Sequence, residues 1–144
     1  MQCSSSIDEK VRFEFIFLTV NSSYSGTHVA VILYSVLNRT SFDRVGEFLG
    51  FVARHSDGGY CVLAANFADY PKHLHQVTTE EGIECANKYN LPFVQVSAKS
   101  GRGIMKLRKI VLETALDNQK ARKVNREREH RKSRRKHDDD IYLD

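Results

Sequence analysis

The sequence predicts an α/β fold in which a parallel sheet is flanked by helices. Short apolar runs, typical of buried strands, alternate along the chain with segments in which apolar residues recur at helical spacing. Polar loop residues follow two of these runs, as they do at the carboxyl ends of parallel strands. The chain has 144 residues, of which 41% are hydrophobic and 28% charged, and this composition is ordinary for one globular domain.

The first 28 residues are expected to form an irregular or strand-like segment. Within it, residues 11–20 (VRFEFIFLTV) are rich in aromatic and β-branched side chains, and their first half alternates apolar with charged residues. Residues 21–27 are rich in Ser and Gly and predict a turn. We expect residues 11–20 to form an antiparallel hairpin with the next strand, because that strand would otherwise expose an edge.

Residues 29–36 (VAVILYSV) form a continuous apolar run that predicts a buried parallel strand. Ser41 is expected to cap a helix over residues 42–54, in which apolar residues recur at helical spacing. Asp57-Gly58-Gly59 then predicts a turn into a second strand over residues 60–65.

Thr78 and Glu81 have the spacing of a capping box and predict the start of a helix of about ten residues. Residues 92–96 predict a third strand, and residues 97–103 a loop after it. A further helix is expected from Ile104 onward. The inner positions expected on the two helices are Ile83, Ala86 and Tyr89 or Asn90, followed by Leu107, Ile110, Val111 and Leu116.

The positive charge of the chain is concentrated after the body formed by residues 29–119. Residues 1–119 carry 12 basic and 12 acidic side chains, whereas residues 120–136 carry 10 basic and 2 acidic ones. With so few apolar residues, the segment 120–144 is expected to be disordered or a solvated extension of the last helix. It could attract an acidic partner, namely nucleic acid, an acidic membrane or an import receptor.

Two loop segments predict a binding site. Ala65-Asn66-Phe67-Ala68-Asp69 and Ser97-Ala98-Lys99-Ser100-Gly101 each follow a predicted strand, and Ser97 comes about thirty residues after Asn66. Together they resemble the paired guanine-reading loops of Ras-superfamily small GTPases of the Rab type, whose first loop has the pattern Asn-Lys-x-Asp. Residues 32–36, 41–42 and 78–82 are similar to the segments around these loops in that family.

The resemblance implies a role for each loop residue in binding GTP or GDP. Asp69 would accept hydrogen bonds from guanine N1 and N2, and Asn66 would brace the two loops. Ala98 would offer its backbone N–H to guanine O6, with the Lys99 stem along the base. Phe67 replaces the stacking lysine of the family and could itself stack on a base. The residues so assigned to the nucleotide are Asn66, Phe67, Asp69, Ser97, Ala98 and Lys99.

The same resemblance implies a partial domain. The sequence has no phosphate loop of pattern G-x-x-x-x-G-K-[ST], and no Asp-x-x-Gly segment precedes residue 29. The likeness therefore covers the C-terminal half of a P-loop-NTPase-type G domain, with the N-terminal strands missing, as in a truncated product. We expect weak or absent nucleotide binding, no Mg²⁺ site, no catalytic residue and no GTP hydrolysis.

Within the superfamily, the chain resembles the Rab-like proteins associated with a J domain. The similar segments are residues 11–15, Ala65-Asn66, Lys72-His73 and Glu81-Gly82, with a faint likeness at residues 138–143. No His-Pro-Asp motif is present, so stimulation of Hsp70 is not implied. The family implies effector or regulator proteins as partners, and a role in signalling or vesicle trafficking. A pseudo-GTPase that competes for such partners would need switch surfaces, which this likeness does not cover.

The cysteines, the hydropathy and the termini of the sequence indicate the cellular compartment. Cys3, Cys61 and Cys85 are odd in number and widely spaced, which favours a reducing compartment, and the last two are expected in the core. No apolar run has the roughly 20 residues of a membrane span, no signal peptide is evident, and no C-terminal cysteine is present for a prenyl anchor. A cytoplasmic or nuclear location is expected. The histidines are interpreted as isolated surface residues.

Overall fold

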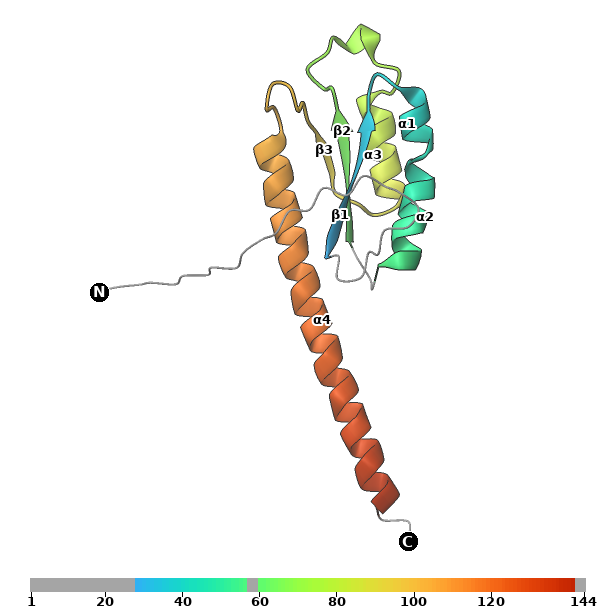
Figure 1. The fold of residues 1–144 in the computed structure, drawn as a ribbon, viewed down its shortest axis with the longest axis vertical. Helices are drawn as coiled ribbons and strands as arrows, with labels where there is room; N and C mark the ends of the chain where they lie inside the picture. The colour runs from blue at the N-terminus through green and yellow to red at the C-terminus, as the bar shows by residue number, and fades with distance from the viewer. Residues whose placement is uncertain (1–27, 57–59, 142–144) are drawn as a thin grey trace, which may run out of the picture.

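The sheet of the molecule is parallel and three-stranded (Figure 1). The structure is a computed structural model that describes residues 28–56 and 60–141, with side chains through residue 134. The strands are β1 (Val29–Ser35), β2 (Tyr60–Asn66) and β3 (Phe93–Gln95), in the order β1-β2-β3. This arrangement confirms the predicted α/β fold with a parallel sheet.

Helices cover both faces of the sheet. Figure 1 shows α1, α2 and α3 on one face and α4 on the other, so the body has three layers. The helices are α1 (Arg39–Asp43), α2 (Val45–His55), the short 3₁₀-helix η1 (Lys72–Leu74), α3 (Thr79–Lys88) and α4 (Ile104–Ile141). Among the described residues, no helix combines the length and the apolar composition needed to cross a membrane.

Strand β2 is the centre of the core. Its residues Val62, Leu63, Ala64 and Ala65 have no exposed surface, because β1 and β3 flank it and helices cover both of its faces. Alternate side chains point to opposite faces. Leu63 and Ala65 thus join the cluster with α2 and α3, whereas Val62 and Ala64 join the cluster with α4.

Strand β1 differs from the uniformly buried strand that its apolar run predicts. Ile32 and Tyr34 are buried toward α2, but Val31 and Leu33, on the face of α4, are 41% and 55% exposed. Within the described part of the chain, β1 pairs with β2 alone and α4 covers only part of its outer face. The predicted strand at residues 11–20 and its hairpin lie outside the described residues, as do the turn at residues 57–59 and Cys3.

The predicted cap at Ser41 is wrong, and Asn38 takes this role. The Asn38 side chain accepts a hydrogen bond from the Ser41 backbone N–H at 3.2 Å, and Ser41 lies inside α1. The Ser41 hydroxyl instead contacts the end of β1, accepting from the Ser35 N–H at 3.0 Å. The single helix predicted here is divided at Arg44 into α1 and α2.

Helix α3 begins with the predicted capping box. The Thr78 hydroxyl accepts from the Glu81 N–H at 3.2 Å, and the Glu81 carboxylate accepts from the Thr78 N–H at 2.9 Å. The predicted inner face is only partly correct, because Ala86 is buried but Ile83 and Tyr89 are 43% and 41% exposed. Cys61 is buried, as predicted, whereas Cys85 is half-buried.

The first part of α4 packs on the sheet. Ile104, Leu107, Ile110 and Val111 contact the cluster around Val62 and Val94, which confirms three of the four inner positions predicted for this helix; the fourth, Leu116, is half-buried. Asn118 is 2% exposed and donates to the His28 carbonyl at 2.7 Å, which ties the helix to the start of β1. Beyond this bond, α4 leaves the body (Figure 1).

Gly82 is placed where α3 approaches the sheet too closely for a side chain. A Cβ atom there would lie 2.8 Å from the Phe93 ring and would collide with the Tyr34 hydroxyl. We expect Gly82→Ala to lower the free energy of unfolding by about 1–3 kcal/mol, measured by urea titration. The control is Gly50→Ala, where the nearest atom is 3.4 Å away. Equal stabilities of the two variants would contradict this packing.

The capping box also predicts a pH dependence. The Thr78 backbone N–H and then the Arg39 guanidinium lower the pKa of Glu81 below its ordinary 4.5. Because the folded-state pKa is depressed, the stabilisation is present above the unfolded-state pKa and is lost as the pH falls through the folded-state pKa. We therefore expect the stability difference between the parent and Glu81→Gln to shrink below pH 4.5. Glu80→Gln is the control, and a difference independent of pH would refute the assignment.

Candidate functional site

The candidate site lies at the carboxyl end of the sheet. The loop after β2 contains Asn66, Phe67 and Asp69, and the loop after β3 contains Ser97, Ala98 and Lys99. Because the strands are parallel, both loops emerge at the same end, which is the upper end in Figure 1. The structure thus brings the six residues assigned from sequence to one edge of the molecule.

The side chain of Asn66 joins the two loops. Its Oδ1 atom accepts hydrogen bonds from the Phe67 backbone N–H at 2.8 Å and from the Ala98 backbone N–H at 3.1 Å. The second bond spans 32 positions of the chain. One amide oxygen therefore fixes the separation of the loops, and it does so through two backbone donors that would otherwise need water or a ligand.

Backbone hydrogen bonds hold the ends of the strands beneath this bridge. The Asn66 carbonyl accepts from the Val36 N–H at 3.1 Å, which links the end of β2 to the end of β1. The Val96 carbonyl accepts from the Ala68 N–H at 3.1 Å, which links the first loop to the end of β3. The base of the site is therefore a continuous extension of the sheet.

The loop after β3 is shaped by Ser97 and two glycines. Ser97 is 1% exposed, and its hydroxyl accepts from the Ser100 N–H at 3.1 Å. Gly101 and Gly103 have φ values of +79° and +75°, in the left-handed region that side chains disfavour. A Cβ at Gly103 would collide with the Gln95 carbonyl, so glycine is required for this close return of the chain.

Phe67 adopts a backbone conformation that is rare for a bulky residue. Its φ is +67°, and the residue is 38% exposed at the carboxyl end of the sheet. The Tyr70 ring meets it edge-on, with 5.9 Å between centroids and 74° between planes. Tyr70 was missed from sequence, although an aromatic residue three positions after Phe67 in a short loop is a usable signal.

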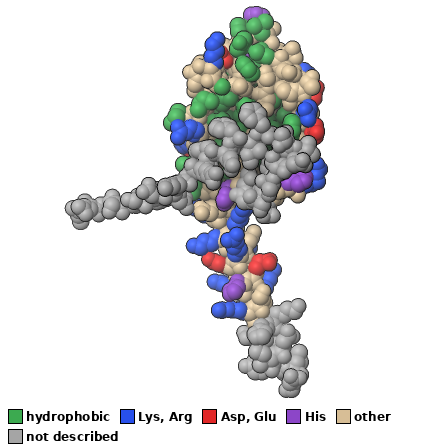
Figure 2. Space-filling view, viewed as in Figure 1, with side chains coloured by type: hydrophobic (Ala, Val, Ile, Leu, Met, Phe, Trp, Pro, Cys, Tyr) green, Lys and Arg blue, Asp and Glu red, His purple; other side chains and the backbone are tan. Residues whose placement is uncertain are grey.

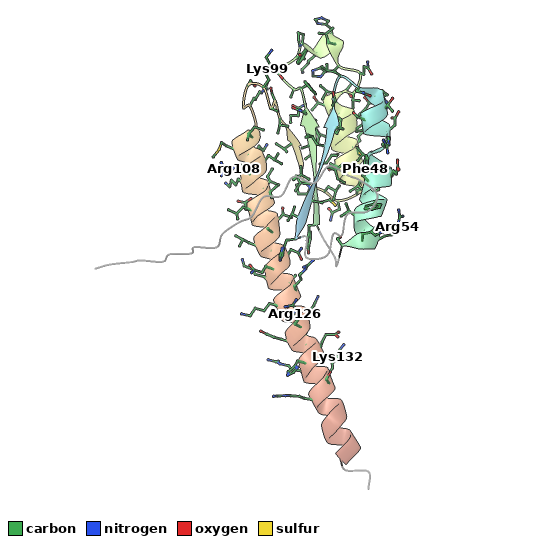
Figure 3. The ribbon with its side chains drawn as sticks, in the orientation of Figure 1. Phe48, Arg54, Lys99, Arg108, Arg126 and Lys132 are labelled. Atoms are coloured by element: carbon green, nitrogen blue, oxygen red, sulfur yellow. The ribbon has the colours of Figure 1, made fainter. Side chains whose placement is uncertain are left out.

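The remaining site residues are exposed. Asp69, Ala98 and Lys99 are accessible to solvent, and Figure 3 shows Lys99 at the outer end of the loop. Asp69 forms no ion pair with a described side chain. The Ala98 N–H, in contrast, already donates to Asn66 and is not free in this structure. The site thus offers an uncommitted carboxylate beside an exposed aromatic ring.

Among the described residues, the candidate site has neither an Asp-x-x-Gly loop nor a cluster of metal ligands. The single Asp-x-x-Gly string of the sequence, Asp43-Arg44-Val45-Gly46, lies where α1 passes into α2 and not in a loop at the site. No group of three or more His, Cys, Asp or Glu side chains that could hold a metal occurs among the described residues.

Comparison with known proteins decides the family. A sequence model described as "Ras family" matches residues 13–131, which is most of the chain. The protein belongs to the Ras family. Its three-stranded parallel sheet with helices on both faces corresponds to part of a small G domain of the Ras type.

Several Ras-family relatives are similar over about half of this chain. The "Ras-related protein Rab-26" of Drosophila melanogaster is 32% identical over 82 residues, which cover 56% of this chain and 21% of that protein. The "GTP-binding protein ypt3" of Schizosaccharomyces pombe is 31% identical over 81 residues, covering 56% and 38%. The "GTP-binding protein Rit1" of Mus musculus is 40% identical over 70 residues, covering 47% and 32%. The chain matches less than half the length of these three relatives.

Asn66 provides the direct test of the loop bridge in this Ras-family chain. We expect Asn66→Ala to lower the free energy of unfolding by about 1–2 kcal/mol, because two backbone donors lose their acceptor. Hydrogen exchange of the Ala98 amide, followed by NMR, should become faster. Asn66→Asp is the matched control, since its carboxylate retains an acceptor at the same position. Unchanged exchange at Ala98 in Asn66→Ala would show that the bridge does not order the loop.

Proposed function

We propose that this Rab-like chain contacts the base of GTP or GDP through its two loops, with an affinity weakened by the lack of phosphate contacts, and does not hydrolyse GTP. The observation that carries the proposal is the hydrogen bond from Ala98 to Asn66 at 3.1 Å, which joins the two loops at the carboxyl end of the sheet. Family membership supports a guanine nucleotide as the ligand.

Asp69 supplies selectivity in this proposal. A carboxylate accepts from the guanine N1–H and N2–H groups, whereas adenine presents no matching pair of donors. Asp69 is exposed and free of ion pairs with described side chains, so it can meet a base without first breaking a salt bridge. A mismatched base would leave this carboxylate desolvated and without donors, and this penalty exceeds the net free energy that the hydrogen bonds contribute.

The hydrogen bond between Ala98 and Asn66 reduces the free energy that base binding can gain. The Ala98 N–H is assigned to guanine O6, yet in the structure it donates to Asn66 Oδ1. Binding therefore exchanges the bond between the loops for a bond to the base, and the net gain is small. Phe67 and Tyr70 compensate through their exposed ring faces, on which a base can stack, while the Lys99 stem covers the base from the other loop.

Phosphate recognition limits the affinity. The 144 residues contain no G-x-x-x-x-G-K-[ST] pattern, whose backbone amides and lysine would cradle the phosphates. A nanomolar site corresponds to about −12 kcal/mol, and half of that free energy leaves a dissociation constant of tens of micromolar. Hydrolysis needs positioned phosphates, Mg²⁺ and an oriented water, and we assign none of these roles to a residue of the described ranges 28–56 and 60–141.

The finer assignments belong to the same proposal. We infer a J-domain-associated type of Rab-like protein in the cytoplasm or nucleus, with effector or regulator proteins as partners in signalling or vesicle trafficking. The similarity of residues 11–15, Ala65-Asn66, Lys72-His73 and Glu81-Gly82 to that type supports this inference.

A second candidate function rests on the basic segment after residue 119. The continuation of α4 away from the body favours a binding module that acts through this segment, with or without nucleotide.

Calorimetric titration with GDP and Mg²⁺ tests the proposed nucleotide site. We expect a dissociation constant of tens of micromolar or weaker for GDP, and no heat of binding for ATP. Asp69→Ala should abolish GDP binding, whereas Asp117→Ala, which removes an exposed carboxylate on α4, should leave it unchanged. Phosphate release from GTP should not exceed the rate in buffer.

Two results would contradict the proposal of a nucleotide site in these loops. Equal binding of GDP by the parent and Asp69→Ala would remove the base-reading role of Asp69. Nanomolar binding that requires Mg²⁺ would show that the chain holds phosphates by contacts outside the loops.

A further inference from the structure

We propose that the projecting basic part of α4, residues 120–136, binds nucleic acid by its phosphate backbone. We call this segment the basic stalk. The proposal concerns a surface distant from the loops of the candidate site and does not depend on the proposed nucleotide binding.

The basic stalk extends from the body as continuous helix. A hydrogen bond from Asn118 to the carbonyl of His28, the residue before β1, ties α4 to the body, and α4 continues to Ile141. At 1.5 Å per residue, the 17 residues of the stalk span about 25 Å. Apart from the half-buried Arg122, its described side chains, through residue 134, are exposed. A surface of this length is accessible without any change in the body.

Positive charge surrounds the stalk. It carries ten Lys and Arg residues against Glu127 and Glu129. With 100° between successive residues, Lys120, Arg126 and Lys132 fall on three different sides of the helix, and no side wider than about 60° lacks a basic residue. Figure 2 shows Lys and Arg side chains on both sides of the stalk, and Figure 3 labels Arg126 and Lys132 along it.

Three central Arg residues of the stalk are not neutralised by described neighbours. The last ion pair between described side chains along α4 joins Asp117 to Lys120 at 4.0 Å, where the stalk begins. Arg126, Arg128 and Arg131 form no ion pair with a described side chain. A partner with closely spaced negative charges would therefore gain attraction without displacing internal salt bridges.

The distribution of charge favours nucleic acid over a lipid surface. A membrane contacts one side of a helix, and an interfacial helix needs an apolar face opposite its charged one. The stalk has Val124 and Ala121 as its only apolar residues. A nucleic-acid groove instead presents phosphates on both flanks, and the major groove of DNA is wide enough to admit a helix. Six of the ten basic residues are Arg, which can bind phosphate through two donors.

The composition also predicts the mode of binding. Residues 120–136 contain no aromatic side chain, so stacking on bases is not available. Binding should rest on phosphates, depend little on sequence, and weaken steeply with salt because each neutralised phosphate releases counterions.

The experiment uses the full chain and fluorescence anisotropy with a labelled 20-bp DNA duplex and an RNA hairpin, over a series of salt concentrations. The stalk variant is Arg126→Gln/Arg128→Gln/Arg131→Gln. The matched control is Lys106→Gln/Arg108→Gln/Lys109→Gln, which removes the same charge from exposed positions of α4 on the body. We expect the stalk variant to bind at least tenfold more weakly and with a salt slope smaller by about 2–3, and the control to change affinity less than about threefold.

Three further measurements separate this proposal from its alternatives. Val124→Pro retains every charge but breaks the helix, and should weaken binding several-fold if the helix itself docks. Vesicles containing phosphatidylserine should bind more weakly than the duplex at the same salt concentration. Asp69→Ala should bind nucleic acid like the parent, so failure of the nucleotide site and failure of the stalk are distinguishable.

Four outcomes would overturn the proposal. They are no binding of either nucleic acid at 50 mM salt, equal losses in the stalk variant and its control, full binding by Val124→Pro, and preference for vesicles over the duplex. The last would assign the stalk to an acidic membrane instead.

Discussion

The complete burial of the central residues of β2 is the constraint on which the rest of the structure depends. Its four central residues have no exposed surface, so the register with β1 and β3 is fixed on both sides. Parallel pairing then sends the ends of β2 and β3 to the same edge, where Asn66 can reach Ala98. A slip of one residue would move Asn66 to the opposite face and remove the bridge. The candidate site is therefore a consequence of the core.

Local sequence patterns predicted both the main elements of the fold and the residues of the candidate site. Apolar runs predicted the three strands, the Thr78 capping box predicted the start of α3, and the segments after two strands predicted the site residues. The predictions failed where tertiary neighbours decide. The cap at Asn38 required knowing that the Ser41 hydroxyl contacts the end of β1. The exposure of Leu33 depends on which elements cover the edge strand β1, and that of Ile83 on which elements cover its face of α3. The left-handed backbone conformation of Phe67 cannot be predicted from the residue type.

The two proposals place different demands on the molecule. Base contact relies on the rigid edge of the sheet, because one amide oxygen orders two loops and a small rearrangement frees the Ala98 N–H. The basic stalk relies on net charge and helix continuity, and apart from the half-buried Arg122 its described side chains are exposed. Residues 1–119 carry equal numbers of basic and acidic residues, 12 of each, so the positive field of the chain belongs to the stalk.

The central claim is that this Ras-family chain holds a base without holding phosphates, and the most direct measurement compares guanosine with GDP. NMR titration of the isotope-labelled chain should give dissociation constants within about tenfold of each other, with or without Mg²⁺, since about 1.4 kcal/mol or less separates them. Amide shifts should be concentrated at residues 66–70 and 97–100. GDP binding that is a thousandfold tighter than guanosine binding, or shifts confined to other parts of the chain, would contradict the claim.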